Sequence, residues 1–480
     1  MKKVLVLGAS GYIGSQLLHQ LCEQGYNVTA AARQIEYLKA RTLPHPLLTI
    51  TYLDLADREA TLKLVPQFDI VYFLVHGMAE GHDFVDYEIS LAENFTAALD
   101  QSNVEQVIYL SAIQPQTGNS EHLKARRMTG EILRTSHVPI TEIRAGVIIG
   151  PGSAAFEIMR DFVYNLPALV TPKWVDSKAN PIALQNLNHY LLELAKSPTE
   201  EHKLYEAGGP DILSYRDQFK VICAASQRPY RLFATPLLTP KIASYWLGMV
   251  TSVPSNIGSA LLAGLEHDFV ADSREIEQRF PQKMIRFEEM VTTSIAQEGK
   301  FVRSKVWGFD PAALKRWQAG YGYYPKQTGA SIETVLSAEQ IWQVVKTLGR
   351  LDDPYFFANY LWRTREWLDI FFGGRKPIRR MPEGPELKVG DFIDSWKVIR
   401  CEKNQFLSLL FGMQGPGLGR LEFTITDLGD KRSLNITAWW HPQGFRGLLY
   451  WFAMMPAHLF IFKGMVKAIV KKAKLKAQDG

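Results

Sequence analysis

Apolar and polar positions in the first part of the chain follow two patterns in turn, one typical of buried strands and one typical of helices. The chain opens with a valine- and leucine-rich run, KVLVLG, which ends in Gly8 and is typical of a buried parallel strand. In the next segment Ile13, Leu17 and Leu21 recur with helical spacing, and Gly25 marks its end. A further apolar run, YNVTAAAR, completes a strand–helix–strand unit of about thirty residues.

The same alternation predicts four more strands. They are TITYLDLAD, which ends at Asp54 and Leu55, FDIVYFLVHGM, which ends at His76, QVIYLSAI, which ends at Ser111, and ITEIRAGVIIGPGS, which contains Arg144. Strands that alternate with helices over this length specify an α/β fold with a doubly wound parallel sheet, the Rossmann architecture.

The rhythm changes in the last third of the chain, after an aromatic connector marked by Gly and Pro, YGYYPKQTGAS. A strand and a helix follow, SIETVLS and AEQIWQVVKTLG, and then short alternating runs joined by tight turns. These runs are GDFIDSWKVIRCE, QFLSLLFGM, GRLEFTITDLG and SLNITAWWHP. They predict an antiparallel meander, closed by one long apolar-then-basic helix, and hence an α+β domain.

We therefore expect three parts in the 480 residues. A Rossmann domain would span residues 1–230, a helical cap or extension of it residues 231–325, and the second domain residues 326–480. Pro240 and Pro254 divide the apolar part of the middle segment into short helices. Such helices could cover a substrate site or could equally be plain core, and the pattern permits both.

Composition narrows the class of protein. Hydrophobic residues make up 46% of the chain and charged residues 21%, as in globular proteins. The net charge of +5 is small, and there is no zinc-finger or aromatic-basic pattern, so we expect no nucleic-acid partner. Cys22, Cys223 and Cys401 lie far apart and form no CxxC pair, so we expect no metal and a reducing, cytoplasmic compartment. The apolar run in MKKVLVLGAS is too short for a signal peptide and predicts a strand.

The first strand leads into a glycine-rich turn, GASGYIG, with glycine at every third position. Glycine permits the tight turn, the close approach of backbone to a pyrophosphate and the close packing of helix on strand. The N-terminus of the following helix then faces the phosphates. The turn predicts a dinucleotide site formed by Gly8, Ser10, Gly11, Tyr12, Ile13 and Gly14.

The end of the second strand bears on the choice of cofactor. NAD sites usually carry an acidic residue there, which bonds the ribose 2′-hydroxyl. This chain has Arg33 instead, whose guanidinium can pair with a 2′-phosphate and stack on adenine. We therefore expect NADP(H) in preference to NAD(H), the alternative being an arginine that is merely solvated at a strand end.

These motifs together resemble the short-chain dehydrogenase/reductase superfamily, and in particular its atypical NmrA-like members. The motifs are GASGYIG, the Asp54–Leu55 pair, the fifth strand ending in Ser111, and EIRAGVIIGPG. The resemblance runs over roughly residues 1–210 and implies site roles for the matching positions. Asp54 and Leu55 would border the adenine. The ribose side would be lined by Leu74, Val75 and His76, and the segment after Ser111 would approach the nicotinamide.

The resemblance breaks where a Tyr and a Lys four residues apart should lie, in SEHLKARRMTGE. Alignment on His122 places Arg126 at the lysine position, whereas alignment on Glu131 places Leu123 and Arg127 at the two positions. His122 could donate a proton, because imidazole titrates near neutrality, and Arg126 could hold a ribose but not act as an acid. A polar helix face beside the site is the alternative. Ser111 could bond a substrate oxygen or merely cap its strand.

The last part resembles the helix-grip (START-like) fold, and more narrowly an uncharacterised domain fused behind NmrA-like domains. SWKV, GPGLGRLEF, AWWHPQG and PAHLFIF carry this resemblance. It implies a hydrophobic small molecule held between the sheet and the final helix.

The final helix admits three interpretations. Sixteen residues between Arg446 and Lys463 lack Lys, Arg, Asp and Glu, fewer than the roughly 20 that span a bilayer, and Pro456 interrupts them. A helix buried against the sheet, a peripheral contact with anionic lipid, and a true membrane span all remain open. Aromatic residues followed by a lysine-rich tail are typical of the peripheral contact, which would make a cytoplasmic protein membrane-associated.

Three functions follow from these observations. The first is an NADP(H)-dependent oxidoreductase that acts on a hydrophobic carbonyl or quinone-like compound without the usual Tyr and Lys. The second is a non-catalytic NADP(H) sensor or assembly protein. The third is a lipid- or quinone-binding protein at a membrane surface.

Overall fold

The computed structural model describes residues 1–33, 35, 38–39, 42–77, 84–115, 120–235, 240–262, 265–305, 320–349, 354–371, 384, 386–412 and 415–478. The chain divides into two compact units, Met1–Gly308 and Phe309–Gly480. The segment 306–319, at the C-terminal end of the expected helical cap, lies outside the described residues.

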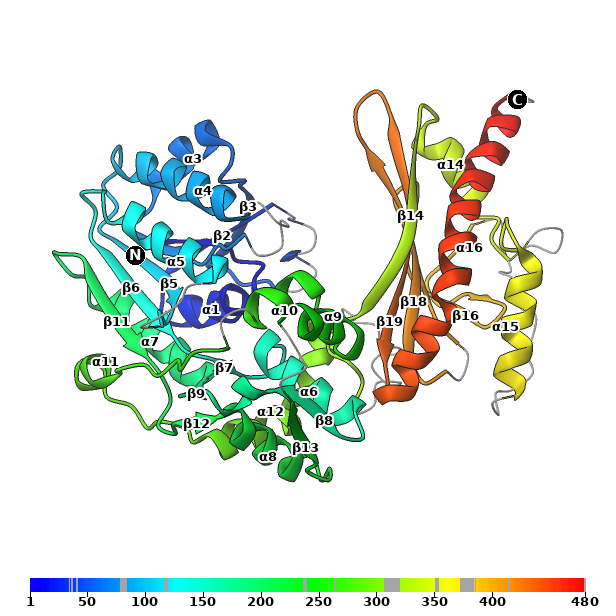
Figure 1. Ribbon diagram of the computed structural model, residues 1–480. Coiled ribbons are helices and arrows are strands. Elements are labelled where there is room, and N and C mark those ends of the chain that lie inside the picture. Colours follow the sequence, from blue (N-terminus) through cyan, green and yellow to red (C-terminus); the bar gives the residue numbers. More distant parts are fainter. Residues whose placement is uncertain are drawn as a thin grey trace. The chain divides into compact units, whose positions relative to one another are not determined.

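The first unit is built on a seven-stranded sheet in which every pair of neighbouring strands is parallel, in the order β11-β6-β5-β4-β1-β2-β3 (Figure 1). Its strands are β1 (Lys3–Leu7), β2 (Asn27–Ala32), β3 (Leu48–Tyr52), β4 (Ile70–Phe73), β5 (Gln106–Ala112), β6 (Ile140–Ala145) and β11 (Lys203–Ala207). The six expected strands and the doubly wound order are confirmed. The seventh strand, β11, had no distinctive pattern of its own and lies beside β6.

Two of the expected strands end earlier than their apolar runs. β3 stops at Tyr52 because Asp54 begins a turn: its carboxylate accepts a hydrogen bond from the Ala56 N–H at 3.0 Å, and its carbonyl accepts one from the Asp57 N–H. β4 stops at Phe73, although the Leu74 N–H still donates to the Leu7 carbonyl of β1 at 3.0 Å. The candidate residues at these positions therefore lie on the loops that leave the sheet.

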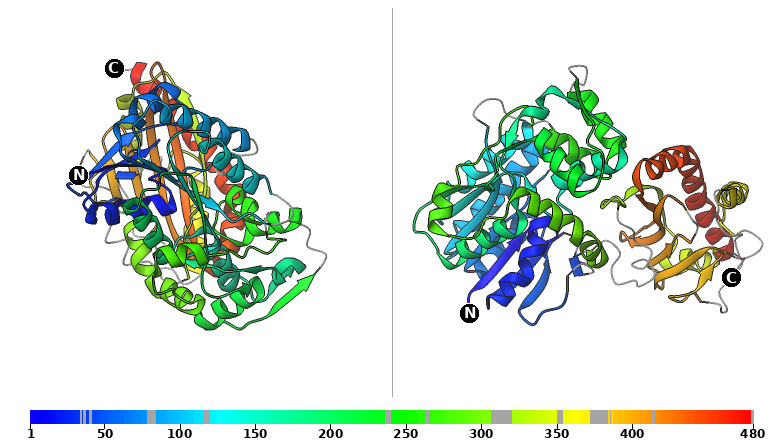
Figure 2. Two further views of the ribbon diagram at one scale, coloured as in Figure 1. Left: turned by 90° about the vertical axis from the view of Figure 1, so that its left-hand side faces the viewer. Right: turned by 90° about the horizontal axis from the view of Figure 1, so that it is seen from below.

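Helices cover both faces of this sheet (Figures 1 and 2). On one face α1 (Tyr12–Glu23) and α7 (Leu184–Lys196) bury their apolar sides in one cluster with β1, β2 and β4. On the other face α4 (Phe84–Leu99) and the end of α5 (Glu121–Leu133) contribute to a second cluster, against which α3 (Arg58–Leu64) packs. A sheet buried on both faces explains why its strands are almost continuously apolar.

A smaller part of the first unit follows β6 and has its own apolar cluster. Its helices are α6 (Ala154–Asn165), α8 (Tyr215–Ala225), α9 (Pro240–Val250), α10 (Ser255–Leu262), α11 (Arg274–Arg279) and α12 (Phe287–Lys305). Short two-stranded pairs join them, formed by β7 (Ile148–Ile149), β8 (Leu169–Pro172), β9 (Lys178–Ala179), β10 (Ile182–Ala183), β12 (Leu213–Ser214) and β13 (Leu232–Thr235). Both prolines mark helix starts as expected, since α9 begins at Pro240 and α10 directly follows Pro254.

The second unit is a six-stranded antiparallel sheet in the order β14-β19-β18-β17-β16-β15, so the expected α+β class is confirmed. The strands are β14 (Lys326–Thr334), β15 (Phe392–Ile393), β16 (Trp396–Glu402), β17 (Phe406–Leu410), β18 (Gly417–Asp427) and β19 (Arg432–Pro442). The helices are α14 (Ala338–Val345), α15 (Asn359–Phe371) and α16 (Gly444–Gln478). Sheet, α14 and α16 share one core.

Candidate dinucleotide and substrate site

The glycine-rich turn between β1 and α1 is shaped so that only glycine fits. Gly8 has φ +80°, and a Cβ there would lie 2.7 Å from the Leu74 carbonyl oxygen. A Cβ on Gly14 would overlap the Gly8 carbonyl, and the Gly11 N–H closes the turn on that carbonyl at 2.9 Å. No side chain caps the N-terminus of α1, and no acidic residue lies in its first turn. The turn therefore fits a pyrophosphate, whose charge the helix N-terminus favours.

The adenine end of the site brings together residues from β2, β3 and α4. Arg33 follows β2 directly, is exposed, and donates a hydrogen bond to the Tyr87 hydroxyl at 3.1 Å. Leu55 is buried, and its carbonyl accepts a hydrogen bond from the Asn94 amide at 3.0 Å, which fixes the loop after Asp54. Asn94 had no role in our sequence-based predictions, because its partner lies 39 positions away.

The loop after β4 carries the residues expected on the ribose side. Leu74 is buried beside the glycine turn, and the Val75 carbonyl accepts a hydrogen bond from Arg126 Nη1 at 3.0 Å. His76 is exposed to solvent, yet protein groups gather around its ring. Partial desolvation of the ring by these groups, and secondarily the nearby Arg126 charge, lowers the pKa of His76.

The structure shows which face of α5 turns toward the strand ends. Arg126 is only 7% exposed and reaches the loop after β4, whereas Arg127 is exposed and lies 3.9 Å from the Glu131 carboxylate. The His122–Arg126 alignment therefore has the geometry of a site and the Leu123–Arg127 alignment does not. Burial by itself would lower the pKa of Arg126, but the Glu88 carboxylate raises it, so its guanidinium stays charged.

Two buried polar atoms at this edge of the sheet make no hydrogen bond of ordinary length with any described residue. They are Ser111 Oγ, at the end of β5, and His122 Nδ1, in the first turn of α5. Buried polar atoms are paired in the great majority of cases, so unpaired ones commonly mark a place where a ligand or water binds. The Ser120 hydroxyl, by contrast, accepts a hydrogen bond from the Leu123 N–H and caps α5.

From the sequence we expected His122 to titrate near neutrality. In the structure its surroundings move its pKa away from that range. Burial, and secondarily the charges of Arg126 and His76, lower its pKa to about 3. At neutral pH its imidazole is uncharged, so it carries one N–H donor and one free nitrogen. It can therefore polarise an oxygen by hydrogen bonding but cannot act as a charged acid.

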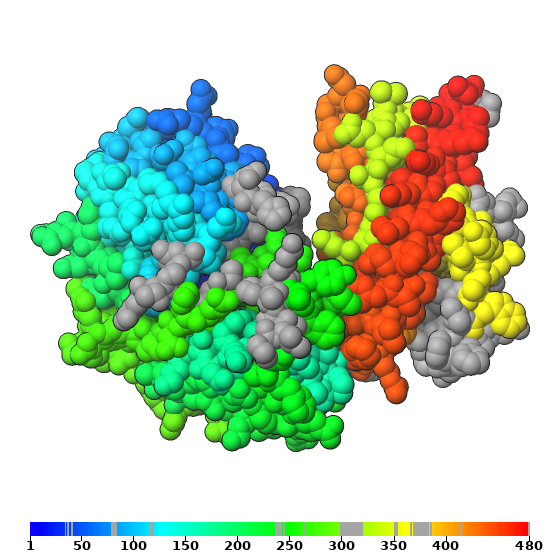
Figure 3. All heavy atoms as spheres, in the orientation of Figure 1, coloured from blue at the N-terminus to red at the C-terminus, as the bar shows by residue number. Residues whose placement is uncertain are grey.

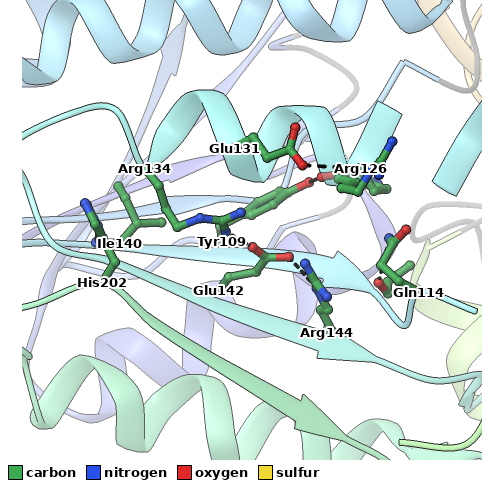
Figure 4. A network of polar contacts seen from close by, with 11 residues as sticks. Tyr109, Gln114, Arg126, Glu131, Arg134, Ile140, Glu142, Arg144 and His202 are labelled. Atoms are coloured by element: carbon green, nitrogen blue, oxygen red, sulfur yellow. Dashed lines mark hydrogen bonds and ion pairs between the residues drawn. The ribbon is translucent and has the colours of Figure 1, made fainter. Parts of the chain in front are cut away.

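A buried ion cluster supports the back of α5 (Figure 4). Glu142 of β6 is fully buried, forms an ion pair with Arg134, and accepts a hydrogen bond from Arg144 Nε at 2.7 Å. On the neighbouring strand the Tyr109 hydroxyl donates to the Arg126 backbone carbonyl at 2.9 Å. Two paired arginines offset the cost of burying the carboxylate, and the cluster holds α5 in register on the sheet.

An apolar pocket, partly open to solvent, lies in the smaller part of the first unit. None of its lining residues in the described part of the chain is charged, and they come from α6, β8, the turn after it, α8, α9, α10, the turn after α10 and the loop after β6. Leu123 of α5 belongs to the same apolar cluster as Met159 and Phe162 of the pocket wall. The residue that follows His122 thus belongs to the apolar cluster on which the pocket is built.

Two hydroxyls interrupt the apolar wall. Thr171 and Tyr215 are each 5% exposed, and neither hydroxyl oxygen has a hydrogen-bond partner among the described residues. Burial raises the pKa of Tyr215, which stays a neutral donor. Our sequence-based predictions missed both residues, since they lie in unremarkable contexts 44 positions apart.

Comparison with known protein families places two domains on the chain. Residues 8–161 match a family described as NAD(P)H-binding, and residues 329–465 match a family described as a protein of unknown function (DUF2867). None of the curated protein sequences compared with the chain matches it. In the part of the chain that the structure describes, no group of three His, Cys, Asp or Glu residues could hold a metal ion.

Solved structures share the fold of the first unit. A nucleoside-diphosphate-sugar epimerase from Staphylococcus aureus is 16% identical, with a TM-score of 0.50, and the match covers 61% of this chain and 100% of that one. UDP-glucuronic acid 4-epimerase from Bacillus cereus, in complex with UDP-glucuronic acid and NAD, is 14% identical, with a TM-score of 0.47 and coverage of 61% and 97%. At such identities the comparison establishes the fold alone. The match to the Staphylococcus aureus protein shows a shared fold, and the family match identifies the first unit as NAD(P)H-binding.

Proposed function

We propose that this NAD(P)H-binding protein is an NADP(H)-dependent oxidoreductase that acts on an apolar carbonyl or quinone-like compound. One observation carries the proposal. Two polar atoms without a hydrogen-bond partner among the described residues, Ser111 Oγ and His122 Nδ1, lie at the cofactor edge, and the neighbouring Leu123 belongs to the apolar cluster that also contains wall residues of an uncharged pocket. A carbonyl group on an apolar body is the kind of ligand that satisfies both features.

The preference for NADP(H) rests on Arg33. Its exposed guanidinium follows β2, where an NAD site usually has an acidic residue. The bond to the Tyr87 hydroxyl orients the side chain, and a guanidinium at this position is the group that can pair with a 2′-phosphate.

Each residue at the site has a limited role in the proposed reaction. A bound nicotinamide supplies or accepts the hydride at the carbonyl carbon. The Ser111 hydroxyl and the neutral His122 ring can donate hydrogen bonds to the oxygen, where negative charge develops during reduction. The buried Arg126 charge favours that negative charge, and it also ties α5 to the loop after β4. The proton that completes the alcohol comes from Ser111 or from solvent.

The pocket favours an apolar substrate over a sugar nucleotide. A nucleoside diphosphate would bring several negative charges to a wall that has no cation among its lining residues, and burying unpaired charge is costly. Thr171 and Tyr215 can hydrogen-bond one or two further oxygens on an otherwise hydrophobic molecule.

The test is NADPH oxidation by the full chain with a panel of a naphthoquinone, a long-chain enal, an aromatic aldehyde and UDP-glucose. We expect turnover with one of the first three. His122→Gln and Ser111→Ala should each lower kcat roughly 10- to 1,000-fold without weakening NADPH binding. His137→Gln and Ser90→Ala, at surface positions remote in sequence, are the matched controls.

Two results would contradict the proposal. Tight NADPH binding with no turnover of any apolar carbonyl would favour a non-catalytic sensor. Undiminished turnover in both site variants would place the chemistry elsewhere.

A further inference from the structure

The last helix of the second unit has one packed face and one exposed apolar face. α16 buries Trp451, Phe462 and Ile469 in the core that it shares with the sheet. On the opposite side its exposed large apolar residues are Phe445 (52% exposed), Leu449 (59%), Phe452 (36%), Leu459 (45%), Phe460 (51%) and Leu475 (52%). Figure 3 shows α16, in red, along the surface of the second unit. An exposed apolar face of this extent is unusual on a protein surface that has no partner.

The exposed residues form a single stripe that changes character along the helix. At 100° per residue, the positions of Phe445, Leu449, Phe452, Pro456, Leu459 and Phe460 fall within an arc of roughly 120°. The same arc continues toward the C-terminus through Lys463, Lys467, Lys471 and Lys474, all exposed. One helix face is therefore apolar in its first half and cationic in its second.

The charge of α16 is entirely of one sign. From Gly444 to Gln478 the helix has one arginine and six lysines, and no Asp or Glu. None of the stripe lysines has an ion pair with a described residue within 4.0 Å, so their charges are not neutralised locally. A partner that covers the whole stripe must offer an apolar surface and, next to it, dense negative charge.

We propose that this face of α16 docks the protein onto the surface of an anionic lipid bilayer. The aromatic and leucine side chains enter the boundary between headgroups and acyl chains, and the lysines contact lipid phosphates. A second copy of the chain would set the lysines against lysines if the two helices were parallel, and against the apolar half if they were antiparallel. Neither arrangement offers the lysines a negative charge. This inference is independent of the reaction assigned to the first unit.

The packed face argues for docking rather than spanning. By length and composition α16 is the one helix in the described parts of the chain that could cross a membrane. Its buried side, however, closes the core of a sheet, and crossing would expose that core. The helix therefore lies along the surface with its exposed stripe toward the lipid.

Vesicle flotation of the full chain tests the proposal, with phosphatidylcholine vesicles and with vesicles containing phosphatidylserine. The lysine variant carries Gln at positions 463, 467, 471 and 474. The matched control carries Gln at Lys63, Lys220, Lys388 and Lys403, which are exposed elsewhere and give the same change of net charge. A third variant, Leu449→Ser with Phe452→Ser, probes the apolar half.

We expect flotation with anionic vesicles that weakens in high salt. The lysine variant should bind roughly 600-fold more weakly, since each of its four lysines near an anionic surface contributes about a factor of five, and the control should bind like wild type. The serine variant should also lose binding, with NADPH affinity and circular dichroism unchanged. No flotation with anionic vesicles, or equal flotation of the lysine variant and its control, would overturn the proposal. Dimerisation in solution abolished by the serine variant, without flotation, would assign the face to a second copy.

Discussion

Single residues decide what the first unit can do, because its backbone is shared by proteins of many activities. Arg33 stands where an acid would select NAD, and His122 and Arg126 stand where Tyr and Lys would be expected. The His122 ring is buried beside two other basic groups, so its properties differ from those of a free imidazole.

Arg33→Ala should weaken NADPH binding roughly 10- to 100-fold, because a charge-assisted contact with phosphate is worth about 1.5–3 kcal/mol. NADH binding should stay unchanged. Calorimetric titration with both nucleotides measures the two affinities, and Arg127→Ala is the control, since that guanidinium faces Glu131. Equal losses for NADPH and NADH would show that Arg33 does not read the 2′-phosphate.

The folded protein should resist protonation of His122 until the pH approaches about 3. The pKa is lower in the folded chain than in the unfolded one, so the unfolded state takes up protons first as the pH falls below about 6.5. Stability present above that pH is lost progressively between about 6.5 and 3, by up to about 2 kcal/mol at pH 5 from this residue. NMR titration of the histidine signals, with His122→Gln for assignment, measures it. A His122 signal with a midpoint near 6.5 would contradict the account.

At the scale of secondary-structure elements, the turn between β1 and α1 is the most constrained connection at the site. Gly8 and Gly25 both have positive φ, at +80° and +84°. A Cβ at Gly8 would strike the backbone at Leu74, whereas one at Gly25 would meet nothing within 4 Å. A substitution at Gly25 therefore tests backbone strain alone, whereas a substitution at Gly8 adds a steric clash.

Gly25→Ala should cost about 1–2 kcal/mol of stability and leave NADPH affinity intact. Gly8→Ala should cost more and abolish measurable NADPH binding, because the turn must open to admit the methyl group. Thermal unfolding and calorimetric titration of both variants provide the comparison. Wild-type NADPH affinity in Gly8→Ala would show that the turn does not form the pyrophosphate site.

The elements that the sequence predicts well are those whose signals are local. The glycine turn and α1 follow from residues within a few positions of one another. The register on α5 did not follow, because it depends on the contact between Arg126 and Val75, which are 51 positions apart. The pocket could not be predicted from the sequence for the same reason, since its wall is formed by several segments between Val147 and Leu265.

At the scale of the whole molecule, two units with separate cores carry two distinct surfaces. The first unit combines a dinucleotide turn with an uncharged pocket, and the second presents a helix face that is apolar and then cationic. An apolar substrate is consistent with a protein that docks on lipid, because such compounds partition into bilayers. The proposed reaction and the proposed membrane docking are nevertheless tested by separate measurements.

The most direct measurement of the central claim is transfer of isotope. The full chain is incubated with a lipid extract and with NADPH that carries deuterium on the nicotinamide carbon that transfers hydride. Mass spectrometry then searches the extract for a labelled compound. For an aldehyde or ketone we predict one deuterium on the carbinol carbon of an apolar alcohol, and for a quinone we predict an unlabelled hydroquinone, because its O–D exchanges with water. Either product should be much reduced with Ser111→Ala and His122→Gln. Formation of neither a labelled alcohol nor a hydroquinone, while NADPH remains bound to the protein, would contradict the assignment of an oxidoreductase.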